Sequence, residues 1–205
     1  MKKFLLLICI VACTAASKGQ DVRKASFGIK AGANFFTIKG EDYKDAGFKT
    51  KTGPHAGLFY QIPIAPLFSI QPELMYSSEG IKYEDEDLKA LVHLNYLNLP
   101  VMFQFVTPSG FYAETGPQLG FVLKAVTKFE PSLGDKYEEN IKEDINKVAF
   151  SWGFGAGYMI GRFGISGRYN LGLSNLPKRA DDPQVEVPND KSSGFQISLV
   201  ARLTK

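Results

Sequence analysis

The stretch FYAETGPQLGFVL, residues 111–123, shows the pattern that decides the fold. Successive side chains of a β-strand point to opposite faces, so every second residue of this stretch shares a face. One face carries Phe111, Leu119 and Phe121, and the other is mainly small or polar, with Glu114 among its residues. A soluble sandwich would bury the apolar face in a core, whereas a membrane barrel turns that face to lipid and keeps polar groups inside. The rest of the chain must decide between them.

The same alternation recurs along the chain. It is clearest at 148–160, where Phe150, Trp152 and Phe154 alternate with glycine and other small residues. One segment also contains Pro100, which has no backbone donor, so we expect a β-bulge there. The alternation predicts eight strands, at 27–38, 55–64, 68–83, 94–106, 111–123, 148–160, 163–172 and 194–203.

The connections between these strands indicate how they are arranged. Short turns follow the second, fourth and sixth strands, whereas long charged loops follow the first, third, fifth and seventh. All long loops therefore emerge at one end, as in outer-membrane barrels whose two termini lie in the periplasm. A soluble barrel of the lipocalin type is the alternative, but the glycine-rich face suits a narrow, filled lumen better. The sequence predicts an all-β, eight-stranded antiparallel up-and-down transmembrane β-barrel.

The first residues have the layout of a secretory signal peptide. Two lysines precede an apolar run at 4–12, and small and polar residues follow up to Gln20. We expect cleavage after Gly19, which makes 1–19 the signal peptide and 20–205 the barrel domain, with cleavage after Ala16 as the alternative. A lipoprotein is a further alternative, in which Cys13 of the segment IVAC would be lipidated and retained.

Removal of the signal peptide changes the composition of the chain. Both cysteines lie within it, so the mature domain has no thiol chemistry and no disulfide. Loss of Lys2, Lys3 and Lys18 leaves 21 basic against 21 acidic residues, so we expect no nucleic-acid partner. No apolar run approaches the ~20 residues of a membrane helix, and the remaining way to cross a bilayer is a closed barrel.

Four segments resemble a known family. They are 28–34 (GIKAGAN), 96–100 (YLNLP), 112–120 (YAETGPQLG) and 168–175 (RYNLGLSN), and they are similar to the PorT-like outer-membrane β-barrel family of Bacteroidetes over essentially the whole mature chain. The resemblance implies a small barrel in the outer membrane of a Gram-negative cell, and its namesake is associated with secretion of proteins to the cell surface. The chain ends in ARLTK, without the terminal aromatic residue that many outer-membrane barrels carry.

Several charged residues fall on the inward register. Because buried charges are costly unless they are paired, we expect them to form a structural network that fills and stiffens the lumen. A polar pathway or narrow solute channel is the alternative, although eight strands leave room for little more than side chains. The predicted network consists of Lys30, Glu73, Glu114, Arg168 and Arg202, accompanied by Gln61, Gln71, Gln104, Gln118 and Gln196.

The sequence offers little support for catalysis or metal binding. A lipid-modifying hydrolase at the extracellular rim would need a serine and a histidine, and His55 and His93 are predicted near that end with Ser77, Ser78 and Ser174. No G-x-S-x-G motif accompanies them, so we expect no enzyme, and we assign no catalytic, cofactor or metal residue. The acidic run at 84–87 lacks the spacing of a calcium loop.

Surface contacts are expected with lipid and through the long loops. Loops 39–53, 84–93, 128–147 and 177–192 are the predicted sites for protein partners, because loops commonly carry function. Aromatic side chains at strand ends anchor barrels at membrane interfaces. Those predicted to face outward are Tyr60, Tyr76, Tyr96, Trp152, Tyr158 and Tyr169.

Overall fold

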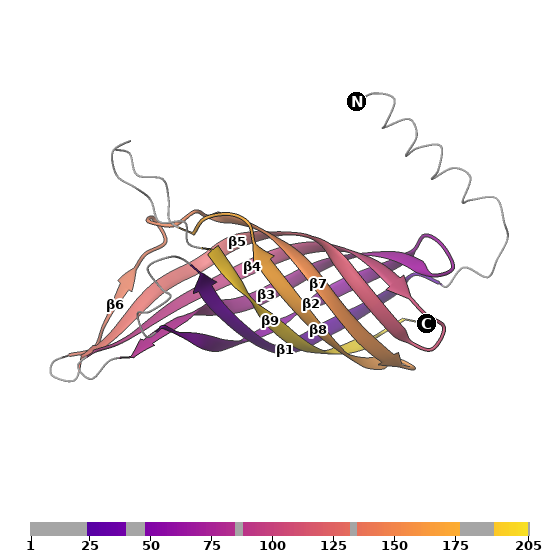
Figure 1. Ribbon diagram of the computed structural model, residues 1–205, viewed down its shortest axis with the longest axis horizontal. Coiled ribbons are helices and arrows are strands. Elements are labelled where there is room, and N and C mark those ends of the chain that lie inside the picture. The colour runs from indigo at the N-terminus through magenta and orange to yellow at the C-terminus, as the bar shows by residue number, and fades with distance from the viewer. Residues whose placement is uncertain (1–23, 40–47, 85–87, 132–134, 177–190, 205) are drawn as a thin grey trace, which may run out of the picture.

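The protein forms a closed antiparallel β-barrel, shown by a computed structural model that describes residues 24–39, 48–84, 88–131, 135–176 and 191–204 (Figure 1). The predicted signal peptide lies outside the described residues. Eight strands build the wall, and a short additional strand, β6, pairs with β5 alone. The strands are β1 (Ser26–Lys39), β2 (Phe48–Pro63), β3 (Phe68–Glu84), β4 (Leu88–Val106), β5 (Phe111–Pro131), β6 (Tyr137–Asn140), β7 (Val148–Ile160), β8 (Phe163–Gly172) and β9 (Lys191–Arg202).

Each wall strand pairs with its neighbours in sequence, and the first strand pairs with the last. β1 and β9 are joined from Gly28 opposite Arg202 to Lys39 opposite Lys191. The ladder therefore runs around the wall without an open edge, which satisfies backbone groups without water. The prediction of an all-β, eight-stranded antiparallel barrel is confirmed. Among the described residues, no helix has the length and apolar character needed to cross a membrane.

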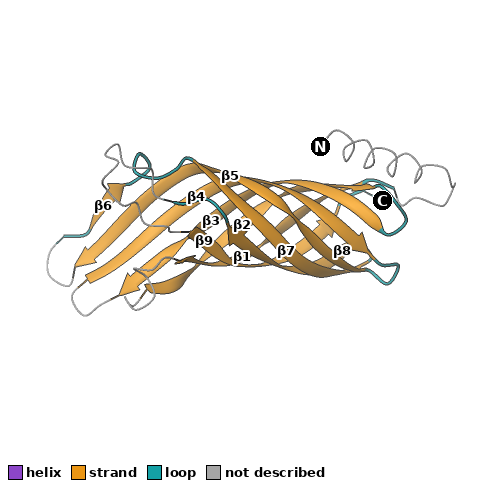
Figure 2. Ribbon diagram, turned by 45° about the horizontal axis from the view of Figure 1, so that its top comes forward, coloured by secondary structure: helices purple, strands orange, loops and turns teal. Residues whose placement is uncertain are grey.

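The two ends of the barrel differ. The short turns at 64–67, 107–110 and 161–162 lie at one end, where β9 also finishes, and we call it the turn end (Figure 1). Gly110 and Gly161 adopt positive φ angles of 99° and 62° in two of these turns, a conformation that favours glycine. The opposite end, which carries β6, is called the loop end (Figure 2).

The outer surface is a band of exposed apolar side chains. On β5 and β7, Leu119 and Phe154 are 44% and 51% exposed, as lipid-facing residues of a membrane barrel should be. The indole of Trp152 and the hydroxyl of Thr115 find hydrogen-bond partners within this band. Trp152 Nε1 donates to Thr115 Oγ1 at 2.8 Å, and that hydroxyl donates to the Gly153 carbonyl at 3.0 Å.

The strands extend further toward the loop end than the sequence predicts. β2 begins at Phe48 rather than residue 55, β4 begins at Leu88 rather than 94, and β5 continues to Pro131 rather than 123. Parts of all four predicted loops are therefore strand, and the remainder of 39–53, 84–93 and 177–192 lies largely outside the described residues. The apolar alternation that reveals lipid-facing strands fades in these extensions, because residues such as Lys89 and Lys124 replace the outward apolar ones.

The bulge predicted at Pro100 is wrong. The registers of β4 with β3 and with β5 continue unchanged through Pro100. The shift occurs instead where Asn95 pairs with Lys124 and Tyr96 pairs with Val122, so Leu123 is the additional residue on β5. This extra residue reverses the alternation and exposes Lys124, which simple period-two counting places inside.

The lumen is filled in layers. Buried polar side chains occupy the middle, and an apolar cluster closes each end. Tyr96 belongs to the cluster at the loop end and is only 2% exposed, so its predicted place in the outer aromatic girdle is wrong. The turn-end cluster is Phe59, Val106, Tyr112, Met159 and Val200, and the loop-end cluster is Ile81, Leu94, Tyr96, Val122, Ala125, Ile145 and Leu176.

Replacing Phe154 by arginine should destabilise the folded barrel in a bilayer by about 2–4 kcal/mol, because Phe154 lies midway along β7 on the lipid face. The measurement is urea unfolding of the protein folded into lipid vesicles. Glu139→Arg, on exposed β6, is the matched control and should change stability by less than about 0.5 kcal/mol. Equal costs for the two arginines would contradict the lipid-facing assignment.

Candidate functional site

The middle of the lumen contains a compact group of four charged side chains. Lys30, Glu73, Glu114 and Arg168 come from β1, β3, β5 and β8, and their side chains are between 0% and 6% exposed. Alternation turns each of them inward, and barrel closure brings the four strands around one axis. Two positive and two negative charges balance, which reduces the cost of burying them.

Arg168 joins the two glutamates. Its Nη1 and Nη2 donate to the two carboxylate oxygens of Glu73 at 2.9 and 2.8 Å, a bidentate arrangement. Its Nε donates to Glu114 Oε1 at 2.8 Å. Lys30 Nζ donates to Glu73 Oε1 at 2.7 Å and lies 3.8 Å from Glu114 Oε2. Each cation therefore contacts both anions, so the group acts as one unit.

Glutamines and a glycine support this group. Gln71 Nε2 donates to Glu73 at 2.8 Å, and Gln104 Nε2 donates to Glu114 at 2.9 Å. Gly155 on β7 leaves the space that Glu114 needs, because a Cβ atom there would lie 3.1 Å from the glutamate Cγ and Oε1 atoms. The small inward residues of β7 are thus the complement of large inward residues elsewhere.

Arg202 is the fifth residue of the predicted network, and the structure places it apart from the other four. It lies half-buried at the turn end, opposite Gly28 of β1. There it lines a hollow together with the turns at 107–110 and 160–161. The hollow lies next to the turn-end apolar cluster, because Val106 and Met159 line it as well. The period-two pattern predicts that Arg202 faces inward, but pattern alone does not give its height in the barrel.

The residues considered for a rim hydrolase are not assembled as one. His55 is 2% exposed and its Nε2 lies 2.7 Å from Ser198 Oγ inside the lumen. His93 Nδ1 lies 2.8 Å from Lys51 Nζ. Ser174 donates instead to the Phe150 carbonyl. His55 lies opposite Ser77 in the ladder between β2 and β3, but its side-chain contact is with Ser198, and that of His93 is with Lys51.

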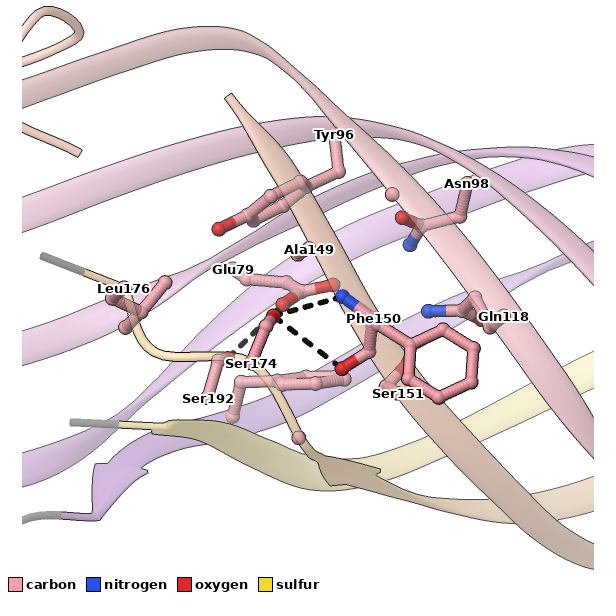
Figure 3. Close-up of a pocket in the computed structure, with 13 residues that line it drawn as sticks. Glu79, Tyr96, Asn98, Gln118, Ala149, Phe150, Ser151, Ser174, Leu176 and Ser192 are labelled. Carbon is pink, nitrogen blue, oxygen red and sulfur yellow. Dashed lines mark hydrogen bonds between the residues drawn. The ribbon is translucent and has the colours of Figure 1, made fainter. Parts of the chain in front are cut away.

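A small cavity with both polar and apolar lining residues lies on the inner side of the loop-end cluster. It measures about 30 Å³, and Figure 3 shows Glu79, Asn98 and Gln118 from three neighbouring strands around it. We call it the Glu79 chamber. Its remaining lining residues are Phe36, Tyr96, Gly120, Ala149, Phe150, Ser151, Gly172, Ser174, Leu176 and Ser192.

Two segments of the chain pack together at the loop-end side of the chamber. Ile145 and Leu176 are buried in the loop-end cluster, and the Asn146 backbone nitrogen donates to the Leu176 carbonyl at 2.8 Å. Asn146 Nδ2 also donates to the Asn175 carbonyl at 2.9 Å. The segment around Ile145 thus forms a cap tied to the end of β8.

The loop end also presents an exposed hairpin. All four residues of β6 are exposed, and Tyr137 stacks on Phe129 of β5 with ring centroids 4.9 Å apart. Lys128 forms an ion pair with Glu138, and the hydrogen bond and positive charge of Lys128 lower the pKa of the Glu138 carboxyl.

The described residues contain no group of three or more histidine, cysteine or acidic side chains that could hold a metal ion.

Comparison with known proteins identifies the family. The model for the outer membrane protein beta-barrel domain matches residues 15–177 of this chain. The chain belongs to that family. It is an outer-membrane β-barrel protein, as the sequence predicts, although the match does not distinguish the narrower PorT-like group. None of the curated proteins matches the sequence significantly.

Solved structures of outer-membrane proteins are similar in fold. The crystal structure of Ail, the attachment invasion locus protein of Yersinia pestis, gives a TM-score of 0.50 at 14% identity and covers 88% of this chain and 100% of that one. Neisserial surface protein A gives 0.49 at 13% identity, with the same coverage. OprG of Pseudomonas aeruginosa gives 0.42 at 12% identity, covering 90% of this chain and 98% of that one. At these identities the likeness to Ail concerns the fold alone.

The sequence analysis did not identify the polar residues that lie between the charged group and the loop end. Asn34 Nδ2 donates to Ser77 Oγ at 2.8 Å, and Ser77 Oγ donates to Glu79 Oε1 at 2.9 Å. Alternation places Asn34 on the same face as Lys30, so that signal was present. Glu79 lies two residues after Ser77, so the same alternation places it inward as well, although Ser78 and Gly80 beside it are also buried.

Replacing Arg168 by methionine should destabilise the folded protein by about 3–5 kcal/mol, because Lys30 alone would then face two buried carboxylates. Chemical unfolding in detergent micelles measures the difference. Lys147→Met is the control, since its ion pair with Glu143 is exposed and should contribute less than about 1 kcal/mol. An Arg168→Met barrel as stable as the control would show that the group does not hold the lumen together.

Proposed function

We propose that this outer-membrane barrel is a non-catalytic protein whose loop end projects from the cell surface and contacts other macromolecules. The observation that carries the proposal is the contrast between the two ends. The turn end closes in tight turns, whereas β4, β5 and β6 continue past the apolar band into an exposed, charged hairpin. Strand extensions of this kind hold a surface in a fixed position, which suits recognition.

In this proposal the turn end and both termini lie in the periplasm. Short periplasmic turns and longer extracellular connections are the usual arrangement in bacterial barrels. The predicted partner loops, 39–53, 84–93, 128–147 and 177–192, would then all face outward. The lipid of the outer membrane would contact the apolar band, including Leu119 and Phe154.

The narrow-channel alternative is less well supported. The lumen is occupied by the charged group centred on Arg168 and by an apolar cluster at each end. A constitutive pore needs a continuous aqueous path, and eight strands leave little room beyond side chains. Discrete conductance steps of the purified protein in a planar bilayer would favour the channel.

A link to protein secretion follows only from the resemblance of the four segments to the PorT-like family. It remains part of the proposal, and comparison of surface and secreted proteins between a deletion strain and its complemented parent would examine it. The rim-hydrolase alternative is disfavoured, since His55 lies inside the lumen with Ser198.

Single cysteines should report the orientation, because the predicted mature chain has none of its own. A membrane-impermeant maleimide should label Glu139→Cys on intact cells, whereas Ser109→Cys in a turn should be labelled only after the outer membrane is opened. Faster gel migration of unboiled than boiled samples would verify that both variants are folded. Labelling of Ser109→Cys alone on intact cells would reverse the orientation and overturn the proposal.

A further inference from the structure

A β-bulge directs a lysine side chain to the outside of the barrel. Leu123 is the additional residue of β5 at the register shift, and both Leu123 and Lys124 are exposed, whereas Ala125 is buried. Without the additional residue, the alternation would direct Lys124 into the lumen. Bulges at barrel rims commonly re-aim a side chain in this way. The bulge therefore places an apolar and a cationic side chain next to each other on the outer surface.

The bulge lies where the apolar band ends. Toward the turn end, the outward residues Leu119 and Phe121 of β5 are exposed and apolar. Toward the loop end, β5 continues into the exposed hairpin with β6. In a bilayer, the edge of an apolar band is the level at which hydrocarbon gives way to charged headgroups. Lys124 thus lies at the level of the lipid headgroups.

Two further lysines lie near Lys124. Lys142 Nζ donates to the Leu123 carbonyl at 3.0 Å, so this ammonium group lies at the bulge itself. On the other side of β5, Lys51 Nζ lies 2.8 Å from Nδ1 of His93, a residue of β4 that pairs with β5 just beyond Lys124. We call Lys51, Lys124 and Lys142 the rim lysines.

The rim lysines differ from other lysines of the loop end in their partners. Among the residues that the structure describes, none of the three forms an ion pair with an acidic side chain, whereas Lys128 is paired with Glu138. Burial lowers the pKa of the His93 imidazole, and nearby lysine charges, that of Lys51 foremost, lower it further. The outer surface around His93 therefore has positive charge available for an anion.

We propose that the rim lysines bind the phosphate groups of a lipid in the outer leaflet of the outer membrane. Basic side chains next to a membrane-spanning surface attract phosphorylated headgroups. A soluble anion would use the lysines alone, whereas a lipid also contacts the exposed apolar residues beside them, Leu123 first. The choice of the outer leaflet rests on the proposed function, in which the loop end faces outward, but the contact with lipid does not.

Native mass spectrometry of the full barrel in a neutral detergent measures lipid binding directly. Phosphorylated lipid A should bind to the wild type, and lipid A without its phosphates should bind on the order of a hundredfold more weakly, as expected for three lost lysine contacts. Lys124→Gln should weaken binding of phosphorylated lipid A about fivefold. Lys136→Gln, which removes an exposed lysine that is paired with Glu130, is the control and should bind as the wild type.

Leu123→Ser tests the apolar part of the site without changing its charge. The variant should also weaken binding of lipid A, and excess inorganic phosphate should not displace the lipid. The proposal is overturned if phosphate displaces lipid A and Leu123→Ser has no effect, because the site would then recognise a free anion. Equal binding of both forms of lipid A, or of Lys124→Gln and Lys136→Gln, would overturn it as well.

This outcome can be separated from that of the proposed function. Binding in detergent does not depend on which way the barrel is inserted. Reversed cysteine labelling together with phosphate-dependent lipid binding would overturn the orientation and the choice of leaflet only. Correct labelling without lipid binding would overturn the lipid site and leave the proposed function in place.

Discussion

Closure of the hydrogen-bonded ladder between β1 and β9 is the constraint on which the rest of the structure depends. In lipid, an unpaired strand edge would leave backbone N–H and C=O groups without partners, and each would cost several kcal/mol. Pairing from Gly28 to Lys39 removes that edge. Once the sheet is closed with eight strands, the width of its interior is fixed, and so is the total volume of the inward side chains.

This narrow interior explains the alternation of large and small residues. Gly153, Gly155 and Gly157 of β7 have no side chain because Arg168, Glu114 and Tyr112 of the neighbouring strands occupy the space beside them. The outer face has no such restriction and carries large apolar side chains. The pattern in β7 is the clearest in the sequence because its outward residues contact lipid and its inward residues must leave space for large side chains.

The sequence was sufficient for the wall of the barrel and for most of its charged centre. Period two gave the inward direction of Lys30, Glu73, Glu114 and Arg168, and an up-and-down order gave their neighbouring strands. It failed where one residue is added or where lipid no longer contacts the sheet. The additional residue Leu123 exchanges the inward and outward positions of β5 beyond it, and a leucine gives no indication of a bulge. Heights within the barrel depend on strand stagger, which is why the period-two pattern groups Arg202, at the turn end, with residues in the middle of the lumen.

The residues that are hardest to predict also lie where the physical constraints are weakest. Within the lipid band, each outward position must be apolar and each inward position must fit the lumen, so the sequence has little freedom. Beyond the band, the extended strands contact water on the outside, and their inner face packs on the cap around Ile145. A polar residue there costs little, and so the loop end can vary in charge and shape while the wall remains intact. Glu79 lies at the boundary between these two regions, where luminal packing still excludes water but the balanced charges of the centre no longer reach.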